Sequence, residues 1–258
     1  LQNPLSQELN SMRQSLIFNG LNNINYNLNR KNKNLKLYEF GKTYSFNKNY
    51  NEDQKLILLA CGQKNDENWN NSNDKIDLYW LKEYIQQILH KIGYHNLEGE
   101  KNKSSFLNNS YKFKSRNKNL VFFGNISKQL LEKFDIKENI VYAEFNWDNI
   151  LKYYTNKTKY KTISKFPQVR RDLALLIDKH IEFESIRQIA MKCENKLIKS
   201  INLFDVYEGD NLPNGKKSYA ISFIIQDQFK TLKEEEIEHI MSKLINSFKD
   251  KIGAEIRM

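Results

Sequence analysis

Apolar residues in the first half of the chain switch between helical and strand spacing. In residues 17–28 they step by four, three and four positions, and residues 78–92 repeat that interval, so each stretch predicts an amphipathic helix. Short apolar runs predict strands at residues 38–46, 55–61, 120–126 and 140–145. We expect a turn near Gly41 and a short helix at 128–134. These elements predict an α+β domain built on a largely antiparallel sheet.

The pattern after residue 165 predicts the order strand, helix, strand, strand, helix, strand. Leu173, Leu175 and Ile177 alternate in the first strand, and Thr231 to Glu234 match a capping box that opens the last helix. The other elements are expected at 183–193, 197–207, 217–226 and 254–257, with a turn at 210–215. This order is that of the split-βαβ, ferredoxin-like fold, a second α+β domain.

In such a fold both helices cover one face of the sheet and leave the other face bare. The side chains expected to face the helices are Leu173, Leu175, Ile177, Tyr219, Ile221, Phe223 and Ile225. Those expected on the bare face are Asp172, Ala174, Leu176, Ala220, Ser222 and Gln226. Small and polar side chains on a bare sheet would let an unpaired base approach it.

The length of 258 residues allows two cores. We expect a first module at 1–151, a lysine-rich connector at 152–164 and a second module at 165–258. No apolar run comes near the roughly 20 residues that cross a bilayer, and no signal-peptide pattern is present. Two cysteines in separate apolar segments indicate buried thiols in a reducing cytoplasm. The chain begins without Met, so we expect it to be a fragment of a longer protein.

The net charge of +10 is unevenly distributed. Residues 149–171 contain seven cations and no acid, and residues 101–118 contain six cations and no acid. Such runs attract the phosphates of nucleic acids. The chain is also rich in Asn and Lys throughout, and biased coding would produce the same runs. Both interpretations stay open.

Several short sequence motifs in the chain match one protein family. In the second half they are residues 165–167, 171–175, 204–207, 215–218, 231–232 and 253–257. This half resembles the ferredoxin-fold anticodon-binding domain of bacterial phenylalanyl-tRNA synthetase β chains. In the first half they are residues 3–6, 12–16, 27–30 and 37–41. That half resembles the non-catalytic class II synthetase-like module of the same β chains, although residues 108–111, which we expect to form a loop, depart from the family pattern.

The resemblance implies the C-terminal part of the β subunit of a phenylalanine–tRNA ligase. The whole enzyme would be an α2β2 heterotetramer that joins phenylalanine to tRNA-Phe with ATP and Mg²⁺. The active site would belong to the α subunit, and editing and metal-contacting domains would precede Leu1. This fragment would hold no cofactor, would dock on the α subunit and would bind tRNA through its second module. The alternative is a structural module for assembly with only incidental RNA contact.

Class II synthetases hold ATP between two arginines, one of them in a glycine-rich motif. Arg13 with Glu39, Phe40 and Gly41 is weakly similar to the first element, but no pair of glycines frames a second arginine. This absence disfavours a self-sufficient synthetase, so we assign no catalytic residue and expect the fragment to be inactive alone. The acids considered for acid–base roles are Glu8, Glu39 and Glu144, for which structural roles are favoured. The four histidines are not spaced, relative to the cysteines or to one another, as metal ligands are, so no metal site is expected.

RNA contact is expected on the second module. The candidates for phosphate contact are Lys165, Arg170, Arg171, Lys216 and Lys217. Phe166 and Tyr207 are candidates for stacking on bases, with a packing role as the alternative for each. Ser222 would lie on the bare face as a hydrogen-bonding group.

Overall fold

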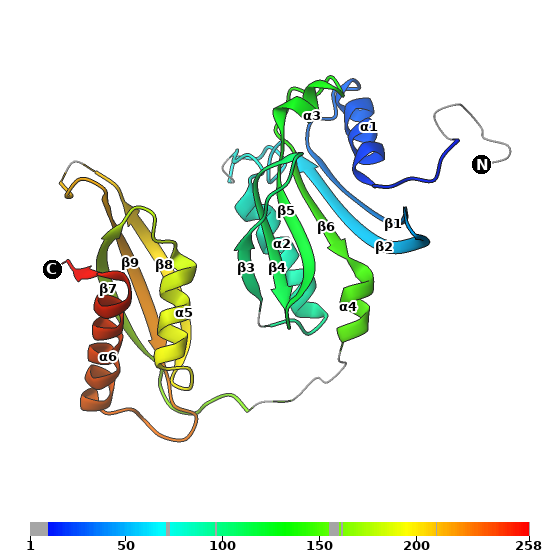
Figure 1. Ribbon diagram of the computed structural model, residues 1–258. Coiled ribbons are helices and arrows are strands. Elements are labelled where there is room, and N and C mark those ends of the chain that lie inside the picture. Colours follow the sequence, from blue (N-terminus) through cyan, green and yellow to red (C-terminus); the bar gives the residue numbers. More distant parts are fainter. Residues whose placement is uncertain are drawn as a thin grey trace. The chain divides into compact units, whose positions relative to one another are not determined.

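A computed structural model describes residues 10–70, 73–95, 97–154, 160, 162–209 and 211–257, apart from the side chain at 153. Contacts within the chain divide it into two units, residues 1–159 and 160–258 (Figure 1). The division falls inside the expected connector, of which residues 155–159 and 161 lie outside the described residues. No helix among the described residues is long and apolar enough to cross a membrane.

The first unit is built on a six-stranded antiparallel sheet in the order β1-β2-β6-β5-β4-β3. Its strands are β1 (Leu35–Asn47), β2 (Asn49–Cys61), β3 (Glu98–Lys101), β4 (Leu107–Ser115), β5 (Lys118–Ile126) and β6 (Val141–Asn146). Its helices are α1 (Ile17–Leu28), α2 (Leu78–Lys91), α3 (Lys128–Glu132) and α4 (Trp147–Tyr153). The expected α+β architecture is therefore present.

Helices cover both faces of this sheet. The apolar stripe of α2 packs with one set of strand residues, which includes Leu56 and Phe145. The apolar stripe of α1 packs with the alternate set, which includes Ile57 and Tyr142. Because successive residues of a strand point to opposite faces, the central strands β2 and β6 supply two separate cores.

Two expectations for the first unit were wrong. Strand β1 does not turn near Gly41; it continues to Asn47, and the reversal comes at Lys48, whose φ is 69°. A Cβ at Gly41 would lie 2.2 Å from a guanidinium nitrogen of Arg13, so glycine permits a side chain to cross the strand there. The segment 108–111, treated as a loop, belongs to β4.

The second unit contains a four-stranded antiparallel sheet in the order β10-β7-β9-β8. In chain order its elements are β7 (Val169–Asp178), α5 (Phe183–Cys193), β8 (Ile198–Tyr207), β9 (Lys216–Ile225), α6 (Glu234–Ile252) and β10 (Glu255–Ile256). This confirms the expected ferredoxin-like order.

Both helices of the second unit pack on the same face of its sheet, and Figure 1 shows them side by side. Their buried residues join the strand residues predicted to face them in a single core, with Ile177, Ile221 and Phe223 fully buried. Burial of each such side chain stabilises the fold by about 1.5–3 kcal/mol. The parity predicted for β7 and β9 is confirmed on this side.

The start of α6 differs from the expected capping box. The helix begins at Glu234 after Lys233, and Lys233 N–H donates to Glu236 Oε2 at 3.0 Å. Thr231 is therefore not the N-cap residue. The helix ends at Gly253, whose φ of 61° suits a residue without a Cβ.

Candidate nucleic-acid interface

The face of the four-stranded sheet opposite the helices is called the open face below. Paired residues of antiparallel strands point to the same side, so the register identifies its members. They are Arg170, Asp172, Ala174, Leu176 and Asp178 on β7; Lys216, Ser218, Ala220, Ser222 and Ile224 on β9; and Ser200, Asn202, Asp205 and Tyr207 on β8. The centre of this face is lined by alanines and serines. The floor is therefore shallow.

An arginine and an aromatic ring form a pair at one side of the open face. The Arg170 guanidinium carbon lies 5.1 Å from the centroid of the Phe204 ring. The same guanidinium donates to both carboxylate oxygens of Asp172, at 2.8 and 3.1 Å. Phe204 occupies a bulge in β8 and is 48% exposed, so its ring is accessible.

A second pair of this kind lies toward the other end of β8. The Arg257 guanidinium carbon lies 5.3 Å from the centroid of the Tyr207 ring. Arg257 is held beside β7 by a bond from its backbone N–H to the Ala174 carbonyl, 2.9 Å. A Cβ on Gly209 would lie 2.4 Å from the Tyr207 hydroxyl oxygen, so glycine leaves room for the ring.

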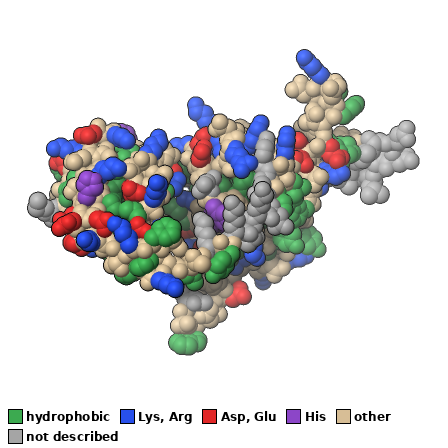
Figure 2. Space-filling view, turned by 90° about the horizontal axis from the view of Figure 1, so that it is seen from below, with side chains coloured by type: hydrophobic (Ala, Val, Ile, Leu, Met, Phe, Trp, Pro, Cys, Tyr) green, Lys and Arg blue, Asp and Glu red, His purple; other side chains and the backbone are tan. Residues whose placement is uncertain are grey.

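Charges on the open face are close to balanced. Lys216 lies 3.4 Å from Asp178 and 3.9 Å from Glu255, and Arg170 is paired with Asp172. Figure 2, which views the molecule from below, shows acidic and basic side chains intermingled on that side. RNA bound here would therefore be held by stacking and hydrogen bonds more than by neutralisation of phosphates.

The structure brings some of the predicted RNA-contact residues together and separates others. Arg170, Tyr207, Lys216 and Ser222 lie on the open face. Ser222 is buried in its floor, where its hydroxyl reaches the Asn202 carbonyl at 3.5 Å.

Two of the predicted phosphate contacts lie on the helix side of the sheet instead. Arg171 pairs with Glu234 at the start of α6. Lys217 is buried, and its ammonium donates to the Tyr219 hydroxyl at 2.8 Å. Neither cation belongs to the open face, because each stands on the parity that faces the core.

Lys165 and Phe166 precede β7. Lys165 is exposed, whereas Phe166 is half-buried. The Phe166 carbonyl accepts from Gln226 Nε2 at 2.7 Å, and its N–H donates to Ser164 Oγ at 3.2 Å. These bonds fix the entry into the sheet, which fits the packing alternative for Phe166.

The sequence pattern missed Phe204, Asp205 and Arg257 as members of this surface. The bulge between Leu203 and Asp205 breaks the alternation of β8, so parity alone could not assign Phe204 to a face. Arg257 follows a closing strand of only two residues, too short to show alternation.

In the first unit, the arginine considered for nucleotide contact is already engaged. Arg13 Nη1 lies 2.6 Å from Glu39 Oε1, and Arg13 Nε donates to the Lys42 carbonyl at 3.0 Å. The two charged residues that are weakly similar to the first ATP-holding element thus hold β1 to the segment before α1.

The other carboxylate considered for acid–base chemistry is also paired. Glu144 Oε2 accepts from the Tyr142 hydroxyl at 2.7 Å, and Glu144 Oε1 lies 3.7 Å from Lys55 Nζ. Burial, followed by the charge of Glu144, raises the pKa of Tyr142 well above its ordinary value. Glu8 lies outside the described residues, which contain no group of three His, Cys, Asp or Glu side chains that could hold a metal ion.

Part of the basic run at 101–118 is neutralised. Glu100 on β3 lies 3.2 Å from Lys112 and 2.5 Å from Lys114, both on β4. Hydrogen bonds from Lys114 and Lys112 lower the pKa of the Glu100 carboxyl. Arg116 and Lys118 are exposed at the β4-β5 turn.

Comparison with known families gives two matches that together span most of the chain. Residues 1–147 match the "Phenylalanyl tRNA synthetase beta chain CLM domain", which is more than half of the chain. The chain belongs to the phenylalanyl-tRNA synthetase β-chain family. Residues 164–257 match the "Ferredoxin-fold anticodon binding domain".

Curated relatives in this family match the whole chain. The phenylalanine–tRNA ligase beta subunit of Bacteroides thetaiotaomicron is 44% identical over 100% of this chain. The corresponding subunits of Porphyromonas gingivalis and Thermotoga maritima are 38% and 26% identical over the same share. The chain spans 33% of the length of these relatives. It thus corresponds to one portion of a β chain.

Among solved structures, the pyrrolysyl-tRNA synthetase of Desulfitobacterium hafniense aligns with 54% of this chain and 48% of its own, at 19% identity and a TM-score of 0.43. A likeness of that size carries no argument about the site.

Proposed function

We propose that the second unit binds unpaired bases of tRNA-Phe, those of the anticodon, on its open face. The observation that carries this proposal is the pair of arginine–aromatic contacts on a sheet face without helices. Anticodon bases are unstacked and are gripped by aromatic or guanidinium planes. The Phe204 and Tyr207 rings and the guanidinium groups above them provide such planes.

Binding would place a base against each ring, above the small side chains of the floor. Each stacked base contributes about 1–3 kcal/mol. Asn202 and Asp205 are exposed on the same face, and their amide and carboxylate groups can bond to base edges. Ala174 and Ala220 keep the floor low enough for a base to lie across the strands.

We also propose the wider setting in which this unit works. The chain would be the C-terminal part of the β subunit of an α2β2 phenylalanine–tRNA ligase in the cytoplasm. The α subunit would join phenylalanine to tRNA-Phe with ATP and Mg²⁺, and this fragment would have no active site of its own. Family membership supports this setting, and so does Arg13, whose guanidinium is occupied by Glu39 and the Lys42 carbonyl.

The second candidate function is assembly with only incidental RNA contact. The balanced charge of the open face favours it, because most RNA-binding surfaces carry an excess of unpaired cations. Under this alternative, substitutions on the open face leave tRNA affinity unchanged.

The test measures the affinity for tRNA-Phe by electrophoretic mobility shift at a fixed 150 mM salt. It compares the original chain with the Tyr207→Ala and Phe204→Ala variants. We expect each variant to bind at least about fivefold more weakly, the loss of one stacking plane. Tyr79→Ala is the matched control, since Tyr79 is an exposed aromatic of the first unit. Equal affinity of all three variants and the original chain would support the assembly alternative.

Catalysis is tested separately by phenylalanine-dependent exchange of pyrophosphate into ATP. We expect no exchange from the chain alone. Measurable exchange would show that the fragment contains an active site after all.

A further inference from the structure

Cations gather without acids in the part of the first unit that surrounds α1. Residues 10–38 contain five arginines and lysines and no aspartate or glutamate. Arg13 pairs with Glu39, and the Lys36 ammonium donates to the Lys64 carbonyl at 2.6 Å, so these two cations are engaged. The other three lie in the connection between α1 and β1 and are called the basic corner below: Arg30, Lys31 and Lys33.

The charges of the basic corner have no acidic partner. All three side chains are exposed, and among the described residues no carboxylate forms an ion pair with any of them. The ammonium groups of Lys31 and Lys33 make no hydrogen bond within this part of the chain either. By contrast, Lys112 and Lys114 are both paired with Glu100. A high lysine content therefore does not by itself leave lysines unpaired.

Arg30 is held in one position and has a free edge. Its guanidinium carbon lies 3.4 Å from the centroid of the Tyr26 ring, and its Nη1 donates to the Tyr26 carbonyl at 3.0 Å. Its Nε and Nη2 groups make no hydrogen bond to the described residues. These neighbouring N–H groups match two oxygens of one phosphate, and a guanidinium that is already held in place loses less entropy when it binds.

The backbone of the basic corner is also fixed. The Asn32 N–H donates to the Asn27 carbonyl at 3.1 Å, which ties the connection to the end of α1. On the other side, a Cβ on Gly62 would lie 2.4 Å from the Lys33 carbonyl oxygen, so glycine lets the chain after β2 approach the connection closely. The positions from which the three cations extend are therefore set before any ligand binds.

Stabilisation of the helix dipole accounts for part of this arrangement only. A cation near a helix C-terminus interacts favourably with the last carbonyls, as Arg30 does through its bond to Tyr26. That role uses one N–H group of Arg30. It leaves the free edge of the guanidinium and both lysines without a function.

The residues around these cations are polar. Every residue from 29 to 34 is an asparagine, a lysine or an arginine. Protein interfaces are depleted of charge at their centres and enriched in aromatic side chains. Phosphates of nucleic acids are contacted by arginine, lysine and asparagine side chains. The composition of the connection is therefore that of a phosphate-binding surface.

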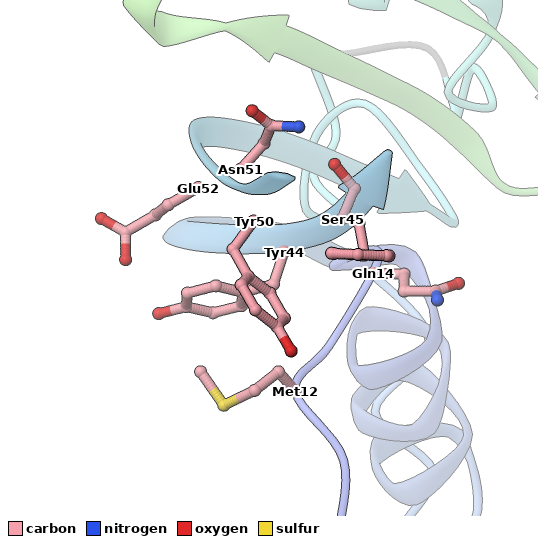
Figure 3. Close-up of a pocket in the computed structure, with 8 residues that line it drawn as sticks. Met12, Gln14, Tyr44, Ser45, Tyr50, Asn51 and Glu52 are labelled. Atoms are coloured by element: carbon pink, nitrogen blue, oxygen red, sulfur yellow. The ribbon is translucent and has the colours of Figure 1, made fainter. Parts of the chain in front are cut away.

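The depression on the β1-β2 hairpin is a surface of a different kind. Its volume is about 390 Å³, and Figure 3 shows the Tyr44 and Tyr50 rings next to each other, with the Met12 side chain directed toward them. The described residues that line it include one charged side chain, Glu52, which lies 2.6 Å from Lys42. This depression offers no free cation to a phosphate, in contrast to the basic corner.

We infer that the basic corner binds phosphates of an RNA backbone, as a second RNA contact separate from the open face. Arg30 grips one phosphate through its free edge, and the two lysines neutralise neighbouring phosphates as point charges. The choice of RNA over an acidic protein segment rests on the proposed function, on the free edge of Arg30 and on the polar surroundings.

The experiment measures the affinity of the whole chain for an RNA duplex without unpaired bases, by fluorescence anisotropy at a series of salt concentrations. The test variant carries Arg30→Gln, Lys31→Gln and Lys33→Gln together. We expect it to bind at least about tenfold more weakly, with a slope of log affinity against log salt that is smaller by about 2 to 3, because three phosphate contacts are lost.

The matched control removes the same number of charges elsewhere. Lys192, Lys249 and Lys251 are exposed lysines of α5 and α6, and their triple replacement by Gln should leave affinity and slope unchanged. Arg30→Lys is a second test, which keeps the charge. It should keep the slope but bind more weakly, since an ammonium cannot span two phosphate oxygens. Circular dichroism during heating should give every variant the melting midpoint of the original chain.

Four results would overturn the inference. They are no measurable binding of the duplex by the original chain, equal affinity of the test variant and the original chain, equal losses in the test and control variants, and binding of polyglutamate as tight as that of the duplex. The third would show that net charge alone matters. The last, if lost in the same test variant, would assign the basic corner to an acidic protein segment.

The duplex keeps this inference distinct from the proposed function. It has no unpaired base, so we expect Phe204→Ala and Tyr207→Ala to bind it like the original chain. The test variant should lose the same factor in affinity for tRNA-Phe and for that tRNA with a different anticodon. If the open-face variants leave tRNA affinity intact while the test variant loses the duplex, the base-binding proposal fails and the basic corner stands.

Discussion

The sheet of the first unit is covered by helices on both faces, whereas the sheet of the second unit is covered on one. Leu56 and Ile57, neighbours on β2, belong to two different cores. Phe223 and Ser222, neighbours on β9, face a core and the open face respectively. The same antiparallel architecture is therefore used in two ways.

The side chains left exposed by each sheet differ in kind. On the first unit they are aromatic rings of the edge strand β1 and the start of β2, among them Tyr38, Phe46 and Tyr50. On the second they are small floor residues flanked by two arginine–aromatic pairs, with balanced charges. An exposed sheet surface thus has no function by geometry alone; its side chains determine whether a base or a protein fits.

The largest expected effect tests the two faces of β9. Phe223→Ala should destabilise the second unit by about 3–5 kcal/mol, because it leaves a cavity in the single core. Ile224→Ala, one residue on and half-buried on the open face, should cost much less. Circular dichroism during urea unfolding reports both variants. All three tryptophans, Trp69, Trp80 and Trp147, lie in the first unit, so their fluorescence should give an unchanged midpoint.

Comparable losses from the two substitutions would show that both faces of this sheet are core. The distinction between one-sided and two-sided sheets would then disappear.

The next effect tests the α1 side of the first sheet. Burial raises the pKa of the Cys61 thiol to about 11, and Cys61 belongs to the core that α1 covers. An unfolded thiol loses its proton near pH 8.5, so the folded state binds more protons above that pH and stability falls as pH rises. We expect the first unit to lose about 2 kcal/mol between pH 8 and pH 10, measured by tryptophan fluorescence in urea.

Cys61→Ala should remove most of this dependence. Tyr142, whose pKa is also raised by burial, remains in the variant and will lower the stability of the first unit mainly above pH 10. The same loss of stability in Cys61→Ala would mean that Cys61 is not buried under α1.

A smaller effect tests the shallow floor of the open face. Ala174→Leu adds bulk where a base is proposed to lie, on a half-buried outward position of β7. We expect tRNA-Phe to bind about tenfold more weakly, with the stability of the unit nearly unchanged. Ala174→Ser is the conservative control and should bind normally. Normal binding by the leucine variant would indicate that bases do not occupy the floor.

The smallest effect tests the α2 side of the first sheet. The Asp77 side chain caps α2 by accepting from the Trp80 N–H at 2.8 Å. Burial opposes the charge of this carboxyl, but that hydrogen bond and Lys64 lower its pKa overall. Asp77→Ala should destabilise the first unit by about 1 kcal/mol, and Asp77→Asn, which still caps, by less. Urea unfolding at pH 7 distinguishes them, and equal losses would assign the effect to the charge.

The sequence predicted the second unit well because its elements carry strong local signals. Alternation in β7 and β9 and the helical stripe of α6 each identify one buried face, and the chain order then determines the topology. The stripe of α1, with Ile17, Leu21 and Ile24, was predicted for the same reason.

What the sequence could not show depends on contacts between distant residues. Alternation in β1 was visible, but whether other residues cover those rings is a tertiary property. Gly41 has the signature of a turn, yet it accommodates Arg13 across a straight strand. Strands β3 and β4 are charged and polar, so their hydrophobic signal is weak. In β8 the bulge concealed Phe204.

The proposal that the open face binds anticodon bases is tested most directly by exchanging those bases alone. The chain is titrated, at one stated salt concentration, with tRNA-Phe and with the same tRNA carrying a different anticodon. We predict weaker binding of the exchanged tRNA, and loss of that difference in a Phe204→Ala, Tyr207→Ala double variant. Equal affinity of the original chain for both tRNAs would contradict the account.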